Sequence, residues 1–258
     1  MEELSILEYS ACGNKQSALK LKFRGNHDLR IIFALKKMID QKSYDLVSVR
    51  DIPFHSLKRL EPELRAMGYR MVIDPTWKAV KEKWRYTCLS VLFVKNMLKF
   101  SQIAGNYGFD TVLRYVCGSF KFYGHDIYFR TSHVPCVDDT RSQLSKQIER
   151  KEKMLDADIE FQKEHQNDCA ICSGDYNGAA DEEDCYCRER FNDFIFKDLL
   201  SENTYEEQKL DHCYVSEGFS GKGITVNAEI LDDYYMQFSD HKMISITLKA
   251  GEKNEDSH

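Results

Sequence analysis

Short apolar runs and alternating apolar and polar residues predict strands along most of the chain. Residues 4–8 and 169–173 are short runs of mainly apolar and small residues, while residues 19–23 and 244–248 alternate apolar with polar side chains. A short apolar run is typical of a buried strand, and alternation is typical of a half-buried one. The same patterns predict further strands at residues 46–49, 71–73, 88–94, 112–117, 127–131 and 210–215.

Helical spacing of apolar residues predicts helices between these strands. Apolar residues recur every three or four positions over residues 31–39, which predicts a first helix capped by Asn26 or Asp28. Further helices are predicted at residues 60–67 and 191–200. A long charged helix follows residues 138–140. Its charges are assigned to a solvated face, and its buried stripe is expected to consist of Leu144, Ile148, Leu155 and Ile159.

The order of these elements predicts the fold class α/β (α+β). Many strands are joined by short connections, which favours antiparallel neighbours, and helices interrupt them. We therefore expect a four-layer α/β/β/α sandwich of two packed mixed sheets flanked by helices. The 258 residues include 4 prolines and 13 glycines, and no Gly/Ser- or Pro-rich tract divides them. Residues 1–250 are expected to form a single domain, followed by a polar tail at 251–258.

Composition places the protein in a reducing compartment without a membrane span. The hydrophobic share of 42% is enough for a substantial core. No apolar run approaches the roughly 20 residues that cross a bilayer, and Met1-Glu2-Glu3 is the wrong start for a signal peptide. The nine cysteines are scattered in mostly apolar contexts, which favours buried thiols over a disulfide framework. We therefore expect a cytoplasmic protein.

Two cysteine pairs raise the alternative of a structural zinc site. Cys169 and Cys172 have the usual spacing of two residues, and Cys185 and Cys187 follow with a gap of one. Against zinc, the first pair lies in a predicted strand and the second gap is shorter than that of most zinc sites. We predict that these cysteines do not form a zinc site, and that Cys172 points into the sheet.

The charge distribution gives no simple indication of the partner. The net charge of −6 argues against attraction of the whole surface to nucleic acid, but it allows a local basic groove. An acidic loop at residues 181–184 would repel a polyanion. The basic residues that could line a groove for phosphates are Lys20, Lys22, Arg24, Lys81, Lys83 and Arg85.

Polar residues with catalytic chemistry stand where several predicted strands end. After the strand at residues 169–173, Gly174 permits a tight turn that presents Asp175 and Asn177. Asp and Asn are also ordinary turn formers, so this motif alone is weak. The residues able to share one site are Asp51, His133, Asp175, Asn177, Asp211, Asp240 and His241. Simpler interpretations stay open for two of them, since His133 could bond to backbone and Asp211 could cap or pair.

At these motifs the chain resembles the endonuclease/exonuclease/phosphatase superfamily. The resemblance rests on Gly174-Asp175-Tyr176-Asn177, Ser239-Asp240-His241, the histidine of Thr131-Ser132-His133-Val134-Pro135 and the aspartate of Leu210-Asp211-His212. It covers nearly the whole chain in order. The family includes exonuclease III-like repair nucleases, pancreatic-type deoxyribonucleases, neutral sphingomyelinases and inositol polyphosphate 5-phosphatases.

The resemblance implies a separate role in phosphoester hydrolysis for each candidate residue. Such a reaction needs a positioned water and neutralisation of the charge that develops on the phosphoryl oxygens. By resemblance, Asp175 orients or deprotonates the water, and Asn177 donates to the phosphate or the nucleophile. His241 contacts a non-bridging oxygen, and Asp211 fixes the orientation and tautomer of that ring. His133 stands where the family places a phosphate-contacting His or Tyr.

The residues at the metal-binding positions differ from those that the family carries. Asp51, Asp240 and Ser10 are the residues that the resemblance implies at the site of magnesium, or of manganese in its place. Ser10 and Cys12 stand where the family carries Asn and Asn or Asp, and Arg50-Asp51 replaces its Gln-Glu. Aspartate is one methylene shorter than glutamate, and Arg50 would compete with the cation. The sequence therefore predicts a weakened metal site.

The leading hypothesis is a magnesium-dependent phosphodiester hydrolase, with a nuclease acting on nucleic acid favoured over other substrates. The nuclease preference rests on the exonuclease-like segment at His133 and on the basic residues above. A phosphatase or lipid-headgroup phosphodiesterase is the alternative among enzymes. A binding protein that kept the fold and lost the metal is the alternative from another class.

Overall fold

The first of two six-stranded sheets contains the strands at both ends of the sequence. The computed structural model describes residues 2–11, 27–73, 88–104, 113–139, 143–181, 185–205, 207–231, 239 and 241–251. Within the first sheet β1 and β2 are parallel and the other neighbours antiparallel. Its order is β11 (Ile224–Leu231), β12 (Met243–Ala250), β1 (Glu3–Ser10), β2 (Leu46–Pro53), β4 (Cys88–Lys95) and β3 (Tyr69–Val72).

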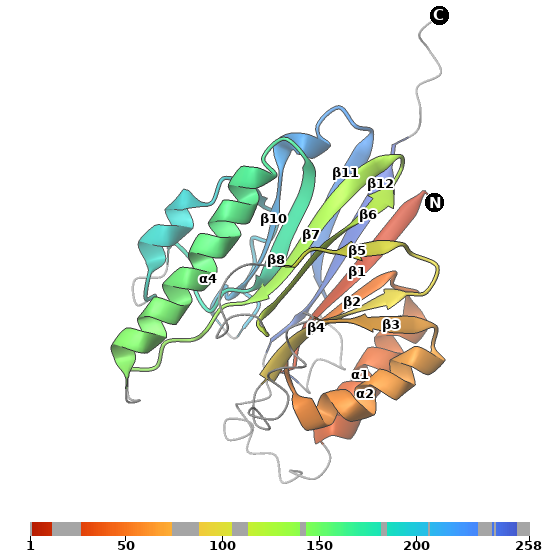
Figure 1. Ribbon diagram of the computed structural model, residues 1–258, viewed down its shortest axis with the longest axis horizontal. Coiled ribbons are helices and arrows are strands. Elements are labelled where there is room, and N and C mark those ends of the chain that lie inside the picture. The colour runs from red at the N-terminus through yellow and green to blue at the C-terminus, as the bar shows by residue number, and fades with distance from the viewer. Residues whose placement is uncertain are drawn as a thin grey trace, which may run out of the picture.

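The second sheet is also mixed. Its strands β7 and β8 are parallel, and the remaining neighbours are antiparallel. Their order is β5 (Phe100–Gln102), β6 (Tyr115–Phe122), β7 (His125–His133), β8 (Cys169–Asp175), β10 (Asp211–Val215) and β9 (Lys197–Asp198). The two sheets lie face to face, as the ribbon in Figure 1 shows.

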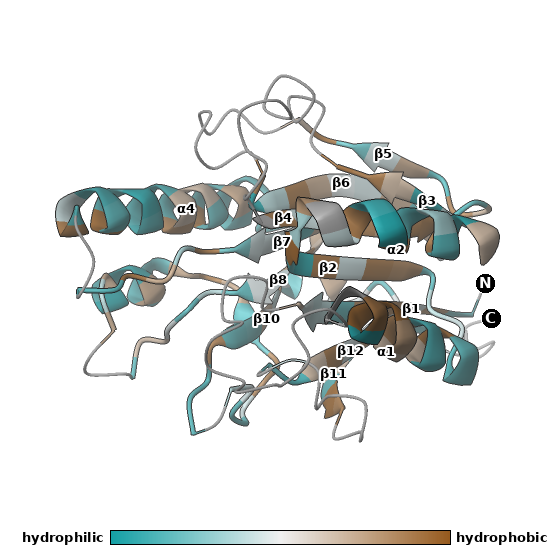
Figure 2. Ribbon diagram, turned by 90° about the horizontal axis from the view of Figure 1, so that it is seen from below, coloured by the Kyte–Doolittle hydropathy of each residue, from teal (hydrophilic) through white to brown (hydrophobic). Residues whose placement is uncertain are grey.

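Three apolar clusters explain the layers. One lies between the sheets and joins residues such as Ile6 and Leu92 to Phe129 and Ile171. A second packs the helices α1 (His27–Gln41) and α2 (Phe54–Ala66) on the outer face of the first sheet. The third packs α4 (Leu144–Glu164) on the outer face of the second sheet (Figures 1 and 2). The predicted four-layer α/β/β/α sandwich is confirmed.

The charged residues of α4 correct one expectation. The helix was expected to keep its charges in solvent, yet Lys151, Asp158 and Gln162 are buried. Asp158 pairs with Arg130 on β7 and accepts a hydrogen bond from Ser132 at 3.0 Å. Two members of the predicted apolar stripe, Leu144 and Ile148, are half-buried. The helix therefore contacts the sheet through polar as well as apolar side chains.

The segment after β8 differs from the secondary structure that the sequence predicted. A helix was predicted at residues 191–200, but the structure has a short 3-10 helix, η2 (Arg188–Asp193), followed by β9. The backbone N–H groups of Ile195 and Phe196 both donate to Gln162 Oε1 at 2.9 Å, which takes them out of helical hydrogen bonding. A second short 3-10 helix is η3 (Glu217–Phe219), and β11 had not been predicted. The strand predicted at residues 19–23 lies outside the described residues.

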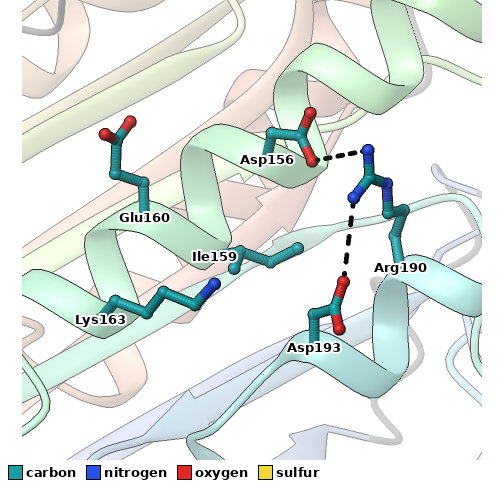
Figure 3. A pocket seen from close by; sticks show the side chains of 6 residues that line it. All are labelled: Asp156, Ile159, Glu160, Lys163, Arg190 and Asp193. Carbon is teal, nitrogen blue, oxygen red and sulfur yellow. Dashed lines mark ion pairs between the residues drawn. The ribbon is translucent and has the colours of Figure 1, made fainter.

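A shallow pocket marks the surface where α4 meets η2. Arg190 of η2 joins the two elements through an ion pair of 3.4 Å to Asp156 on α4, and it also contacts Asp193 of η2 at 3.8 Å (Figure 3). Ile159, Glu160 and Lys163 complete its lining. None of the candidate catalytic residues lines this pocket. Within the described ranges, no helix is long and apolar enough to cross a membrane.

Cys172 lies in the sheet, as the sequence predicted. Cys172 is buried in β8, with its sulfur 3.1 Å from the Tyr176 hydroxyl, and burial raises the pKa of its thiol well above the usual value. Cys185 and Cys187 are partly exposed in the segment that leads into η2. The absence of zinc stays a prediction.

Candidate active site

The candidate catalytic residues meet at one end of the second sheet. Asp175, the last residue of β8, lies in register with His133 on β7 and with Asp211 on β10. The preceding Gly174 allows this close packing, because a Cβ there would lie 2.0 Å from the carbonyl oxygen of Ser132. Neighbouring strands therefore present three polar side chains at one edge.

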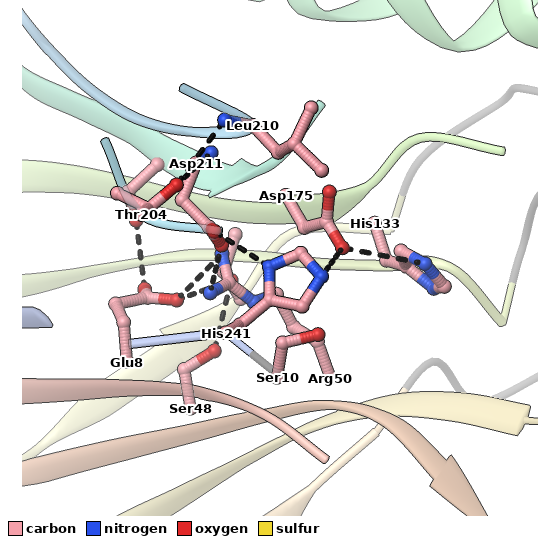
Figure 4. Close-up of polar contacts among 12 residues, drawn as sticks. Glu8, Ser10, Ser48, Arg50, His133, Asp175, Thr204, Leu210, Asp211 and His241 are labelled. Atoms are coloured by element: carbon pink, nitrogen blue, oxygen red, sulfur yellow. Dashed lines mark hydrogen bonds and ion pairs between the residues drawn. The ribbon is translucent and has the colours of Figure 1, made fainter. Parts of the chain in front are cut away.

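Asp211, His241 and Asp175 form a chain of polar contacts. The Nδ1 atom of His241 lies 2.7 Å from Asp211 Oδ2, and its Nε2 atom lies 3.6 Å from Asp175 Oδ2 (Figure 4). The Asp211 carboxylate accepts a hydrogen bond from the Nδ1–H group of His241. This bond fixes the orientation of the ring, so that Nε2 faces Asp175. Thr204 Oγ1 in turn accepts the backbone N–H of Asp211 at 2.8 Å. All three members of the chain are buried.

His133 approaches the same carboxylate from the other side. Its Nε2 atom lies 3.7 Å from Asp175 Oδ2, while Nδ1 lies 3.3 Å from the Arg114 guanidinium. A guanidinium can only donate, so Nδ1 is the acceptor and the ring proton lies on Nε2. Burial, together with the charge of Arg114, lowers the pKa of His133 to about 3. The ring is therefore neutral at physiological pH.

Asn177 holds the loop that follows Asp175. Its backbone N–H donates to Asp175 Oδ1 at 3.0 Å, and its side-chain amide donates to the carbonyl of Val134 at 2.8 Å. The ammonium of Lys151 donates to the Asn177 carbonyl at 2.8 Å. Asn177 has a φ of 50°, a conformation that Asn tolerates better than most residues. In the structure this residue is a loop anchor, and its role as a phosphate donor stays a prediction.

A buried ion cluster connects the site to the first sheet. The fully buried Arg50 lies 3.2 Å from Glu8 Oε2 and 2.9 Å from Asp211 Oδ1 (Figure 4). Glu8 also accepts hydrogen bonds from Ser173 at 2.7 Å and Thr131 at 3.1 Å. Burial alone would raise the pKa of Asp211, but the charges of His241 and Arg50 and their hydrogen bonds lower it below its usual value. Burial alone would lower the pKa of Arg50, but Glu8 and Asp211 raise it.

Sequence reasoning missed Glu8 and Arg114. Glu8 carried a signal, since a carboxylate within a buried apolar strand needs a partner. Its partner Arg50 was recognised only as a competitor of the metal. Arg114 carried no signal, because its place beside His133 follows from the pairing of β6 with β7, where the His133 N–H donates to the Arg114 carbonyl at 2.7 Å.

The predicted metal ligands lie at the adjoining end of the first sheet. Asp51 has a φ of 49° at an irregularity between β2 and β4, and its Oδ1 atom lies 3.8 Å from His133 Nδ1. The Ser10 carbonyl accepts a 2.5 Å hydrogen bond from Ser239, whose hydroxyl accepts the His241 N–H at 3.1 Å. Asp240 lies outside the described residues. The structure therefore brings Asp51 and Ser10 to the same site as the catalytic candidates.

The charge of the site fits a divalent cation. Glu8, Asp51, Asp175 and Asp211 are buried or nearly so, and among the described residues Arg50 pairs with Glu8 and Asp211 while Arg114 contacts His133. Within the described part of the chain, the carboxylates at the site therefore exceed these arginines in number. Burying such an excess without a counterion is costly.

A closer donor set is less suited to a metal. Asp175, Asp211 and His241 offer atoms within 4.8 Å of one another, close enough to share an ion. However, Asp211 and His241 are already hydrogen-bonded to each other, and Asp211 is paired with Arg50. An ion among these three would have to break both contacts.

Comparison with known proteins establishes the fold. No family model and no curated protein matches the sequence. Among solved structures, D. rerio TDP2 with a single-strand DNA product is 15% identical, with a TM-score of 0.67 over 96% of this chain and 100% of that chain. An endonuclease/exonuclease/phosphatase family protein from Bacteroides thetaiotaomicron is 17% identical, with a TM-score of 0.59 over 95% and 97%. A mannosyl-6-phosphatase from the same organism is 17% identical, with a TM-score of 0.61 over 95% and 99%.

Proposed function

We propose that this protein, which has the endonuclease/exonuclease/phosphatase fold, is a divalent-metal-dependent phosphodiester hydrolase acting on nucleic acid. One observation carries the proposal. A single buried carboxylate oxygen, Asp175 Oδ2, faces the Nε2 atoms of His241 and His133 at 3.6 and 3.7 Å. Those gaps are too long for direct hydrogen bonds, and each is short enough for one water to bridge the carboxylate and the ring nitrogen.

The roles follow from the protons that each group holds. Asp175 accepts a proton from the attacking water and orients it toward phosphorus. His241 contacts a non-bridging phosphoryl oxygen through Nε2. Asp211 keeps the His241 ring oriented and compensates the positive charge that the ring gains. The neutral His133 carries its proton on Nε2, and this N–H group donates a hydrogen bond to a second phosphoryl oxygen. The half-exposed Arg114 adds a positive charge at the edge of the site.

Asp51, with Asp240, would hold the cation. Magnesium keeps several waters and is often bound by one or two carboxylates plus substrate phosphate, so this small donor set suits magnesium or manganese. Bound there, the ion would neutralise charge on the phosphoryl oxygens and the leaving group. The excess of negative charge at the site supports this assignment.

Nucleic acid is the proposed substrate class, and support for it is divided. The D. rerio TDP2 structure holds a single-strand DNA product, while one of the two similar Bacteroides thetaiotaomicron structures is a mannosyl-6-phosphatase. The partly exposed Arg114 beside His133 suits a substrate with further phosphates near the scissile one. The phosphatase alternative is carried by the negative surface charge, since a small monoester is repelled less than a polyanion.

A second candidate is a phosphate-binding protein without turnover. The observation that favours it is Arg50, a fixed cation beside the metal side of the site. Such a protein would bind phosphodiesters through His241, His133 and Arg114 and leave them intact.

Hydrolysis assays with matched variants distinguish these proposals. Supercoiled plasmid, a single-stranded oligonucleotide and a sugar phosphate are incubated with wild type while magnesium or manganese is titrated. Metal-dependent cleavage that is nearly abolished by Asp175→Asn, and unchanged by Asp126→Asn at an exposed pair, supports the enzyme. Cleavage that survives Asp175→Asn overturns the assignment of the base. Binding of the oligonucleotide without cleavage under any metal supports the second candidate.

A further inference from the structure

Arg50 occupies a position between two buried carboxylates that belong to different sheets. Glu8 lies on β1 and Asp211 on β10, and neither side chain is exposed to solvent. The Arg50 guanidinium contacts Glu8 Oε2 at 3.2 Å through Nη1 and Asp211 Oδ1 at 2.9 Å through Nη2. Two facing buried carboxylates repel each other, so this arrangement requires a positive charge between them.

The strand geometry aims the side chain at that place. Ser10 on β1 is in register with Arg50 on β2, and Glu8 is in register with Ser48. Side chains two residues apart on a strand share a face, so Glu8 and Arg50 both point toward the second sheet. Ser48 shares this face and contacts Thr131 on β7 at 2.8 Å. The guanidinium is therefore held by the backbone pairing of the central strands.

We propose that Arg50 is a resident cation, which fills a Glu8–Asp211 site that would otherwise take a divalent metal ion. Its first consequence is exclusion, since neither Glu8 nor Asp211 can coordinate a metal while each is paired with the guanidinium. Its second consequence is positioning. The charge on Asp211 that orients His241 is maintained by a residue of the chain, whatever the metal concentration.

The same pairing restricts the metal proposed for catalysis to the Asp51 side. Arg50 is a positioning residue for His241, because it acts through Asp211, which is hydrogen-bonded to both of them. The inference concerns the site of the proposed hydrolase. Its test measures metal binding and thermal stability, so it can fail or succeed independently of any activity.

Removing the guanidinium should create a metal site. Arg50→Met is made in an Asp51→Asn background, so that the proposed catalytic metal position does not contribute. Manganese binding is followed by the electron paramagnetic resonance of the free ion, and the melting temperature is measured with and without metal. We expect one new bound ion, and a melting temperature that rises by about 5–10 °C at about 100 times its dissociation constant. Arg65→Met, at an exposed pair with Glu61, is the matched control and should bind no additional ion.

A second variant decides the question if Arg50→Met does not fold. Glu8→Gln keeps Arg50 paired with Asp211 and removes one carboxylate. With Glu8 excluded from metal binding, the manganese affinity of this variant should stay within about twofold of wild type, whereas loss of even a residue that supports a metal ligand costs about tenfold or more. A loss of that size in Glu8→Gln would show that Glu8 binds metal beside Arg50. A folded Arg50→Met variant with no new ion would show that the two carboxylates cannot form a cation site. Either result overturns the proposal.

Discussion

The strand ends of the two sheets meet at one site, but they contribute different kinds of residue. The second sheet supplies His133, Asp175 and Asp211, the residues proposed for phosphoester hydrolysis, which contact one another or His241. The first sheet supplies Arg50, which pairs with Asp211, and Asp51, whose carboxylate lies 3.8 Å from His133. The comparison teaches that the proposed acid–base residues and the buried positive charge that compensates Asp211 come from different sheets of the candidate site.

The largest expected effect tests how the second sheet keeps its geometry. Asp158 on α4 pairs with the buried Arg130 behind the site and accepts from Ser132, the residue before His133. Asp158→Ala leaves a buried guanidinium uncompensated, so we expect a loss of about 3–5 kcal/mol in the free energy of unfolding by urea denaturation. Asp156→Ala removes the half-exposed partner of Arg190 on the same helix and should cost about 1 kcal/mol or less. Equal losses in the two variants would show that Asp158 does not anchor β7.

The next effect separates the contributions of the two sheets to turnover. His241→Ala removes the proposed phosphate contact and should lower kcat by an amount equivalent to about 2.7–4 kcal/mol, by analogy with a removed oxyanion donor. Ser10→Ala on the first sheet keeps the carbonyl that binds Ser239 and should change kcat only slightly. Steady-state kinetics on a cleaved substrate measure both. A larger loss in Ser10→Ala than in His241→Ala would reverse the division between the sheets.

A smaller effect concerns the outer edge of the second sheet. Asp198 on β9 accepts from His212 at 2.7 Å and pairs with Lys209 at 2.6 Å. Although burial alone would raise its pKa, His212 and Lys209 lower the pKa of Asp198 from 3.8 to about 2. The depressed value stabilises the fold above pH 3.8 by about 2 kcal/mol, and this contribution is lost as the pH falls to 2.

The measurement is the free energy of unfolding of wild type and Asp198→Asn as a function of pH. We expect the difference between them to be constant from pH 7 to about pH 5 and to shrink below it. A difference that stays the same down to pH 2 would mean that the ionised carboxylate is not the stabilising form.

The smallest effect restores the first sheet to the family pattern. Ser10→Asn with Asp51→Glu supplies the amide and the longer carboxylate that the superfamily carries there. We expect the magnesium concentration for half-maximal activity to fall about tenfold, as for an added metal contact. Asp51→Ala should raise it. A doubly substituted variant whose magnesium requirement is unchanged would place the ion elsewhere. Activity that appears only in this variant would instead favour a natural binding protein.

Most strands of both sheets were predictable from the sequence, but the contacts between side chains on different strands were not. The strand predicted at residues 169–173 ends two residues before Asp175, and the one predicted at residues 210–215 contains Asp211, so the pattern located these two candidate residues. The role of Arg50 could not be predicted, because its partners Glu8 and Asp211 lie on strands far from it in sequence. The buried Asp158 was also missed, since a charge on an amphipathic helix is assigned to solvent unless its partner on another element is known.

The pairing of β1 with β12 determines when this protein can work. Glu3 lies opposite Lys249, and β1 is a central strand of its sheet, between β12 and β2. The contacts that complete the site, from Ser239 to Ser10 and from His241 to Asp211, also join early and late parts of the chain. During synthesis the ribosome releases residue 8 long before residue 241. The emerging polypeptide therefore exposes one edge of β1 for most of its translation, and the candidate site cannot be complete before β12 has docked.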